Sequence, residues 1–144
     1  MNLIIGAGAV GTVLAGYFAK ARQPLQFLVR SAELGDFNGL EQLQVTRIHG
    51  GAPLRAPCPK VTTSLNLTGV KRVFICVKYP DLAALLEQFP TELPADVELF
   101  PCINGPAIGR LFRERFSGTA ITPLVIQFNA LLRGPMDEIG RAHV

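Results

Sequence analysis

Three features of the 144-residue sequence predict an α/β fold, a doubly wound and mostly parallel sheet with helices on both faces. Short, continuous apolar runs alternate with segments of helical periodicity, which is typical of βαβ units. A glycine-rich turn separates the first apolar run from the first helical segment. Hydrophobic residues make up 49% of the chain, which is enough apolar material to bury a core. The length predicts one domain over residues 1–144.

Residues 1–30 predict one strand–helix–strand unit. The apolar run at 2–5 is typical of a buried parallel strand, which is continuously apolar rather than alternating. A helix follows, because apolar residues recur at the helical spacing: Val10, Val13, Leu14, Tyr17 and Phe18. The next strand is expected over residues 25–29, and such crossovers are almost always right-handed.

Residues 31–72 contain many glycine, proline and asparagine residues, which predict an irregular excursion from the sheet. A small antiparallel element is expected there. Two short strands are expected in this region, at residues 45–48 and 61–63.

The remainder of the chain resumes the strand–helix alternation. Three strands are expected, at residues 73–77, 97–100 and 120–128. A helix begins at Pro80, where proline is tolerated, and its buried face is Leu82, Leu85, Leu86 and Phe89. A turn at residues 104–106 leads into another helix that ends near Phe116. One more short strand is expected after Gly134.

Gly6-Ala7-Gly8-Ala9-Val10-Gly11 forms a GxGxxG turn between the first strand and the first helix. In this context the first glycine permits a tight turn, the second lets a pyrophosphate approach the backbone, and the third allows close helix packing. Amide N–H groups at the start of the helix then face the phosphates, whose charge the helix dipole favours. The sequence therefore predicts a Rossmann-type domain that binds a pyridine dinucleotide. The alternative is a glycine-rich turn without a ligand.

The residue that closes the second strand indicates which dinucleotide binds. In this fold an acid at that position accepts hydrogen bonds from the ribose 2′-hydroxyl of NAD, whereas an arginine accommodates the 2′-phosphate of NADP. Here the position is held by Arg30, nineteen residues after Gly11, and no acid follows until Glu33. A guanidinium can donate two parallel hydrogen bonds to a phosphate. NADP(H) is therefore the predicted cofactor, and a solvated surface arginine is the alternative.

Two polar residues are expected to face the same crevice as the glycine turn. Ligands of an open parallel sheet bind beyond the carboxyl ends of its strands, where strand order reverses. Lys78 directly follows one predicted strand, and Asn104 lies just beyond the next. Lys78 could donate to a ribose, a phosphate or a substrate carboxylate, and the Asn104 amide could position the nicotinamide or the substrate. The alternatives are a solvated lysine and an asparagine selected for a turn.

Charge and cysteine content argue against other classes of function. The net charge of +3 is small and the basic residues are spread along the chain, so a nucleic-acid partner is not expected. Glycines interrupt the apolar N-terminal stretch, which therefore fits a strand–turn–helix better than a signal peptide or a membrane span. Three cysteines without metal-ligand spacing and two histidines predict neither a metal site nor a disulfide framework. This cysteine usage favours a cytoplasmic location.

Taken together, these features resemble the N-terminal NADP-binding domain of the ketopantoate reductase (2-dehydropantoate 2-reductase) family. The resemblance rests on four segments in order: GAGAVG at 6–11, Arg30, VFICVKYPD at 73–81 and PCINGPAIG at 101–109. It implies that the three glycines form the pyrophosphate turn and that Arg30 binds the 2′-phosphate. It also implies that Lys78 lies at the ribose side of the cofactor and that Asn104 lies between nicotinamide and substrate.

The resemblance further implies a function. The family reduces 2-dehydropantoate, a small 2-oxo acid, to pantoate with NADPH in pantothenate synthesis. Its members carry a second, helical domain that supplies the general-acid lysine, and that domain is expected to be absent from residues 1–144. The chain alone is therefore expected to have little or no activity, and an exposed apolar patch could let it form a homo-oligomer. Two alternatives remain, a stand-alone NAD(P)-sensing module and the cofactor domain of a related imine or opine-type reductase.

Overall fold

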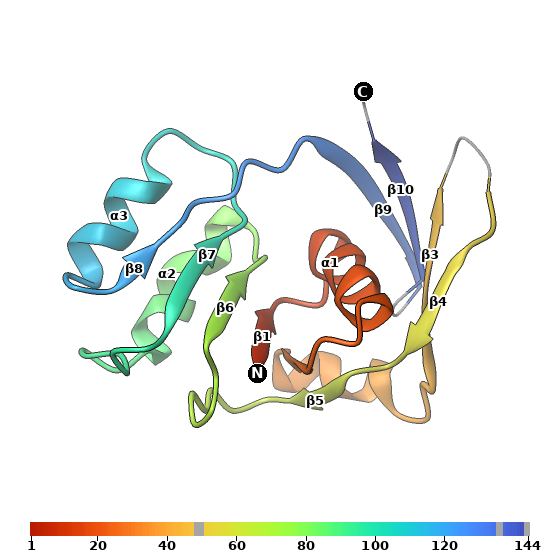
Figure 1. Ribbon diagram of the computed structural model, residues 1–144, viewed down its shortest axis with the longest axis horizontal. Coiled ribbons are helices and arrows are strands. Elements are labelled where there is room, and N and C mark those ends of the chain that lie inside the picture. The colour runs from red at the N-terminus through yellow and green to blue at the C-terminus, as the bar shows by residue number, and fades with distance from the viewer. Residues whose placement is uncertain (48–50, 135–136, 143–144) are drawn as a thin grey trace.

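A six-stranded sheet forms the centre of the computed structural model, which describes residues 1–47, 51–134 and 137–142 (Figure 1). Its strands are β1 (Asn2–Ile5), β2 (Leu25–Leu28), β5 (Lys60–Thr62), β6 (Arg72–Ile75), β7 (Glu98–Pro101) and β8 (Ala120–Ile121). They lie in the order β5-β2-β1-β6-β7-β8, and every neighbouring pair is parallel. The predicted doubly wound sheet is confirmed, with the strand order of a Rossmann fold.

Strand order reverses at β1. The chain runs outward from β1 to β2 and β5, and then returns to β6 on the other side of β1. Ile5, at the end of β1, is in register with both Leu28 of β2 and Ile75 of β6. The segments that follow these three residues therefore leave the sheet at the same edge, which is where an open parallel sheet binds its ligands.

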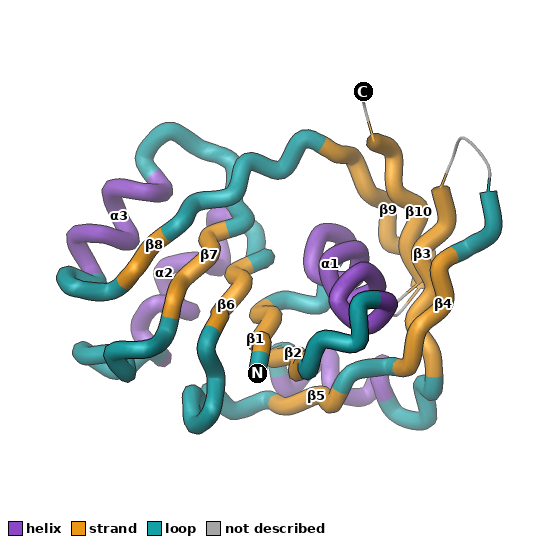
Figure 2. The backbone as a smooth tube through the Cα atoms, in the orientation of Figure 1, coloured by secondary structure: helices purple, strands orange, loops and turns teal. Residues whose placement is uncertain are grey.

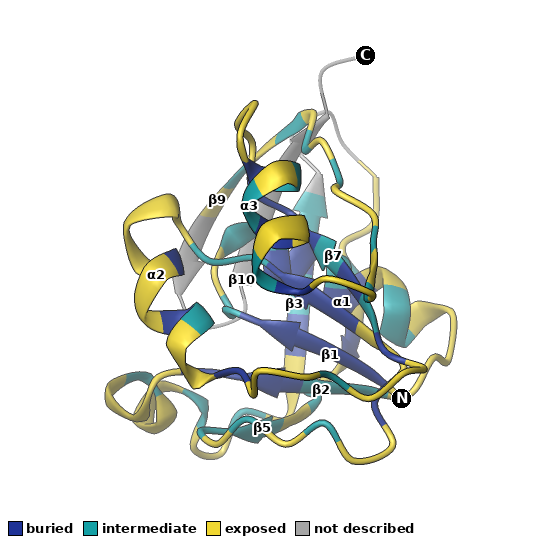
Figure 3. Cartoon of the chain, turned by 90° about the vertical axis from the view of Figure 1, so that its left-hand side faces the viewer, coloured by how far each residue is buried: buried dark blue, intermediate teal, exposed yellow. Residues whose placement is uncertain are grey.

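Helices cover both faces of this sheet, as predicted. They are α1 (Ala9–Lys20), α2 (Tyr79–Gln88) and α3 (Ile108–Arg115). Figure 1 shows α1 on one face and α2 and α3 on the other. Alternate residues of β1 serve the two faces, because Leu3 and Ile5 belong to the core beneath α2 and α3 whereas Ile4 belongs to the core beneath α1. The central strands are buried, and the outer sides of α2 and α3 are exposed (Figure 3).

A second sheet of four strands covers the outer side of α1. Its strands are β3 (Gln42–Arg47), β4 (Leu54–Pro57), β9 (Phe128–Gly134) and β10 (Asp137–Ala142), in the order β4-β3-β10-β9. α1 is thus enclosed between the two sheets (Figure 2). The antiparallel pair β3–β4 confirms the small element predicted within 31–72, and β10 confirms the strand predicted after Gly134. Residue 48, at the end of the strand predicted at 45–48, lies outside the described residues.

The predicted apolar face of α1 packs in the core except at Tyr17, and enclosure between two sheets buries further sides of the helix. Tyr17, predicted to lie on the buried face, is 43% exposed. Small residues on other sides of the helix are buried instead: Gly11, Thr12, Ala15 and Gly16. A Cβ atom on Gly16 would lie 2.9 Å from Cγ2 of Val45, so glycine allows β3 to approach the helix closely.

The single strand predicted at 120–128 is wrong. Only residues 120–121, which form β8, pair with β7 as a strand. Beyond them the N–H groups of Thr122 and Leu124 still donate to carbonyls of β7, at 2.9 and 2.8 Å. Pro101 of β7 has no N–H to donate in return, so the two-sided ladder ends there. The chain then crosses from the first sheet to the second, where β9 begins at Phe128 (Figure 2).

Candidate dinucleotide-binding site

The glycine turn lies at the carboxyl end of β1, where strand order reverses. Gly6 donates its N–H to the carbonyl of Leu28 at 3.0 Å and so remains bonded to the sheet. Its backbone then turns with φ of +93°, a conformation that favours glycine. A Cβ on Gly6 would lie 3.1 Å from the carbonyl oxygen of Cys76. The turn therefore packs against the segment that follows β6.

Gly11 and Gly8 have opposite surroundings. A Cβ on Gly11 would lie 2.1 Å from the carbonyl oxygen of Gly6, so α1 can begin at this height above β1 only with glycine there. Gly8 is exposed, and a Cβ on it would meet no atom within 4 Å. The hydroxyl of Thr12 donates to the carbonyl of Ala7 at 3.4 Å across the turn. The open space above Gly8 is what close approach of a pyrophosphate requires.

The start of α1 has amides that no side chain caps. Gly8 is the N-cap residue and makes no side-chain cap, and the N–H of Thr12 donates to its carbonyl at 2.9 Å. The N–H groups of Ala9, Val10 and Gly11 precede that bond and have no acceptor within the helix. The first turn of α1, which the structure describes in full, holds no acidic residue. Such a terminus favours an anion, so these residues fit the pyrophosphate of a dinucleotide.

Arg30 follows β2 and is the N-cap residue of η1 (Ser31–Phe37), a 3-10 helix. Its side chain is 71% exposed and pairs with Glu33, three residues later. The Arg30 backbone N–H donates to Oε2 of Glu33 at 3.0 Å, and Nε donates to Oε1 at 3.0 Å. The second of these bonds, together with the opposite charges, raises the pKa of Arg30 and lowers the pKa of Glu33. The sequence contains a signal for this pair, because Glu33 follows Arg30 at the three-residue spacing of a capping box. The prediction that Arg30 binds a ligand did not take this spacing into account.

A second carboxylate faces Arg30 from α2. Nη1 of Arg30 lies 3.9 Å from Oδ1 of Asp81, in the first turn of that helix. The segments after β2 and β6 therefore meet across the edge of the sheet at which β1 ends.

Lys78 lies at the same edge. It is the exposed N-cap residue of α2, and its carbonyl accepts a hydrogen bond from the N–H of Asp81 at 3.0 Å. Since Ile75 of β6 is in register with Ile5 of β1, Lys78 follows β6 at the level where the glycine turn follows β1. The structure thus brings the glycine turn, Arg30 and Lys78 to one edge, as the sequence predicts.

The amide of Asn104 is engaged by backbone 22 residues away. Its Nδ2 donates to the carbonyl of Ile126 at 2.9 Å, and the N–H of Ile126 donates to its Oδ1 at 2.9 Å. An asparagine amide has two N–H groups and two oxygen lone pairs, so these bonds use one of each. Asn104 therefore holds the segment that joins the two sheets, a contact that its position after a strand did not suggest.

Two cysteines follow neighbouring strands at this edge. Cys76 comes after β6 and Cys102 after β7, and the N–H of Cys102 donates to the carbonyl of Ile75 at 2.9 Å. A hydrogen bond with Cys102, together with burial, raises the pKa of the Cys76 thiol well above its usual range. Cys76 is therefore protonated at neutral pH, which argues against a role as a nucleophile.

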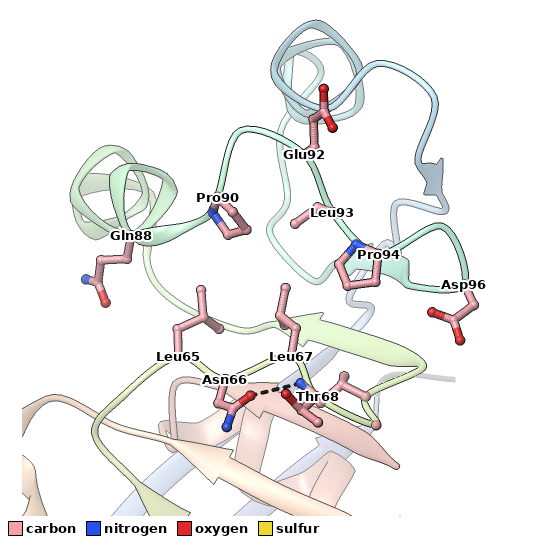
Figure 4. A pocket seen from close by; sticks show the side chains of 12 residues that line it. Leu65, Asn66, Leu67, Thr68, Gln88, Pro90, Glu92, Leu93, Pro94 and Asp96 are labelled. Atoms are coloured by element: carbon pink, nitrogen blue, oxygen red, sulfur yellow. Dashed lines mark hydrogen bonds between the residues drawn. The ribbon is translucent and has the colours of Figure 1, made fainter.

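A pocket of about 620 Å³ lies at the opposite edge, near the amino ends of β6 and β7. Leu65 and Leu67 face Pro90 and Leu93 across it (Figure 4). Since parallel sheets bind cofactors at their carboxyl edge, this pocket is separate from the candidate site.

Within residues 1–47, 51–134 and 137–142, no group of three or more His, Cys, Asp or Glu could hold a metal ion. No helix in the described part of the chain is long and apolar enough to span a membrane.

Comparisons with family models and with solved structures show which proteins the chain is similar to. A family model described as "Ketopantoate reductase PanE/ApbA" matches residues 2–138. The fold superposes on 2-dehydropantoate 2-reductase from Porphyromonas gingivalis W83 with a TM-score of 0.78 and 19% identity, covering 98% of this chain and 51% of that one. It superposes equally well, at 0.78 and 19% identity, on a PanE/ApbA family ketopantoate reductase from Ralstonia eutropha JMP134, covering 100% of this chain and 47% of that one.

A third similar structure is that of D-mandelate dehydrogenase in a ternary complex with NADH and anilino(oxo)acetate. Its TM-score is 0.77 at 19% identity, covering 96% of this chain and 45% of that one. At such identities the likeness establishes the fold. The chain spans about half the length of these solved relatives. No curated protein matches the sequence.

Proposed function

The chain belongs to the ketopantoate reductase family, and on that premise we propose that it binds NADP(H) as the cofactor-binding part of a 2-oxo acid reductase. The observation that carries this proposal is the glycine turn. A Cβ on Gly8 would meet no atom within 4 Å, and the N–H groups of Ala9, Val10 and Gly11, in the first turn of α1, have no acceptor within the helix. A pyrophosphate bound there would accept their hydrogen bonds and meet the positive end of the helix dipole.

Arg30 supports NADP(H) rather than NAD(H). It closes β2 at the edge where the adenosine ribose would lie, and its exposed guanidinium can donate two parallel hydrogen bonds to a 2′-phosphate. Lys78, which follows β6 on the other side of β1, is proposed to contact the ribose or a cofactor phosphate.

A small 2-oxo acid is the proposed substrate, with 2-dehydropantoate as the first candidate. When bound, the nicotinamide supplies the hydride for the keto carbon. The ammonium of Lys78 suits a substrate carboxylate, and Asn104 keeps one N–H and one lone pair beyond its bonds to Ile126. D-mandelate dehydrogenase, solved with NADH and anilino(oxo)acetate, supports considering 2-oxo acids other than ketopantoate as well.

Reduction of a ketone also requires a proton for the developing alkoxide. Of the four lysines of the chain, Lys78 lies at the carboxyl edge, and we have assigned it to binding rather than to proton donation. Lys71 pairs with Asp96 at the opposite edge. Lys20 ends α1 and Lys60 begins β5, both toward the amino ends of the strands. We therefore propose that residues 1–144 bind the dinucleotide but reduce a 2-oxo acid slowly or not at all by themselves. Ordinary steady-state turnover of 2-dehydropantoate with NADPH would contradict this.

Calorimetric titration of the wild type and Gly8→Ala with NADPH and with NADH tests the glycine turn. The added methyl group meets no protein atom but fills the space of the pyrophosphate. We expect an unchanged melting temperature and a loss of at least about tenfold in affinity for both nucleotides. Gly35→Ala, whose methyl group also meets nothing within 4 Å, is the matched control and should bind as the wild type does. Wild-type affinity in Gly8→Ala would place the cofactor elsewhere.

A further inference from the structure

The side of the Arg30 guanidinium that a phosphate would use already binds an anionic partner. Nε of Arg30 donates to Oε1 of Glu33 at 3.0 Å, and Nη2 contacts the same oxygen. Nε and Nη2 form one side of the guanidinium fork, the side that binds carboxylates and phosphates with two parallel bonds. A 2′-phosphate must therefore displace Glu33 or accept the remaining N–H groups.

The charge around Arg30 also opposes the binding of a third anion. Oδ1 of Asp81 lies 3.9 Å from Nη1 of Arg30, so one positive charge faces two carboxylates. Hydrogen bonding to Arg30 lowers the pKa of Glu33, which keeps this carboxylate ionised at neutral pH. The side chains of Arg30, Glu33 and Asp81 together carry a net negative charge, to which a 2′-phosphate would add.

A ribose 2′-hydroxyl would meet a different environment. It is neutral, and it can donate a hydrogen bond to a carboxylate oxygen of Glu33 while Glu33 stays beside Arg30. The same pair of residues therefore presents an acceptor for the NADH ribose and a donor for the NADPH phosphate.

We propose that Glu33 is a determinant of cofactor specificity, which competes with the 2′-phosphate for Arg30 and narrows the preference for NADPH over NADH. This inference rests on the proposed function, since it requires a dinucleotide at this edge. Asp81 acts in the same direction but more weakly, because it lies farther from the guanidinium and makes no hydrogen bond to it within the described contacts.

The test is titration of wild type, Glu33→Gln, Asp36→Asn and Arg30→Ala with NADPH and NADH at one fixed salt concentration. Gln keeps an acceptor for the Arg30 backbone N–H and removes the charge. Asp36→Asn is the matched control, because Asp36 is an exposed acid of the same 3-10 helix, three residues further on. We expect Glu33→Gln to bind NADPH about fivefold more tightly, with NADH binding unchanged or weaker. Asp36→Asn should change neither affinity by more than about twofold.

Each other result has a distinct meaning. An unchanged or weakened affinity of Glu33→Gln for NADPH, while Arg30→Ala loses the preference, overturns the competition and leaves the proposed function intact. Equal NADPH preference in Arg30→Ala and wild type overturns both the phosphate role of Arg30 and the inference. A wild type that binds neither nucleotide overturns the proposed function and the inference with it. Asp81→Asn is a second variant, expected to change NADPH affinity in the same direction as Glu33→Gln and by less.

Discussion

Asn104 and Ile126 are joined by two hydrogen bonds of 2.9 Å, although 22 residues separate them in the chain. Asn104 follows β7 in the first sheet, and Ile126 lies in the segment that crosses to β9 of the second sheet. The pair therefore fixes the crossing segment at the carboxyl edge, beside the candidate site. It gives Asn104 a structural role in addition to the contact with nicotinamide or substrate that we propose.

Asn104→Ala removes both hydrogen bonds. We expect the free energy of unfolding to fall by about 1–3 kcal/mol, because each net hydrogen bond contributes roughly 1 kcal/mol. Urea unfolding measures the change. Asn66→Ala is the control, since its Oδ1 accepts one bond, from the N–H of Thr68 in an exposed loop, and should cost less. Wild-type stability in Asn104→Ala would show that the pair does not hold the crossing segment.

Gly11→Ala should destabilise the protein and remove nucleotide binding together. The new methyl group would lie 2.1 Å from the carbonyl oxygen of Gly6, a backbone atom that cannot rotate away, so α1 must shift. We expect a loss of about 3 kcal/mol, at the upper end of the usual cost of overpacking. Thermal unfolding and NADPH titration of the same sample measure both effects. A stable Gly11→Ala variant that binds NADPH would contradict the close packing described here.

Phe74→Ala tests the core between the main sheet and α1. The Phe74 ring lies 4.7 Å from that of Phe100, with an interplanar angle of 13°, and 5.0 Å from that of Phe18. Phe74 is 6% exposed, so its loss should cost about 3–5 kcal/mol in free energy of unfolding. Val125→Ala, at a side chain that is 75% exposed, serves as the control and should cost little. A small cost at Phe74 would mean that the core collapses to fill the space.

Alkaline pH should destabilise the protein partly through Cys76. The pKa of this thiol is raised in the folded state by its hydrogen bond with Cys102 and by burial. Its contribution to stability is therefore present below the pKa of an unfolded cysteine, about 8.5, and is lost as pH rises through the folded value. Urea unfolding from about pH 7.5 to about pH 10.5 should show a steeper decline for the wild type than for Cys76→Ala. Parallel declines would mean that Cys76 does not contribute.

The parts of the fold that the sequence predicts have local signals. The first βαβ unit, the strand before Lys78 and the helix opened by Pro80 each combine a run of apolar residues with a glycine or proline at the boundary. The placement of the glycine turn, Arg30 and Lys78 at one edge follows from those elements and from the strand order of the fold.

The parts that the sequence did not predict depend on contacts between distant residues. Asp137 of β10 is in register with Gln44 of β3, a pairing that no local pattern indicates. Apolar residues continue from β8 into the crossing segment at Leu124, Val125 and Ile126, so composition alone does not mark where the strand ends. It ends where Pro101, on the partner strand, has no N–H. The bonds from Asn104 to Ile126 likewise depend on where that segment crosses.

The central claim is that the start of α1 binds the pyrophosphate of a dinucleotide. The most direct measurement is a titration of the ¹⁵N-labelled protein with NADPH, followed by the amide shifts of each residue. The account predicts that the largest shifts occur at Gly8, Ala9, Val10 and Gly11, which are the N-cap residue and the first turn of α1. Shifts confined to the pocket at the opposite edge, around Leu65 and Leu93, would contradict it, as would the absence of any shift at saturating NADPH.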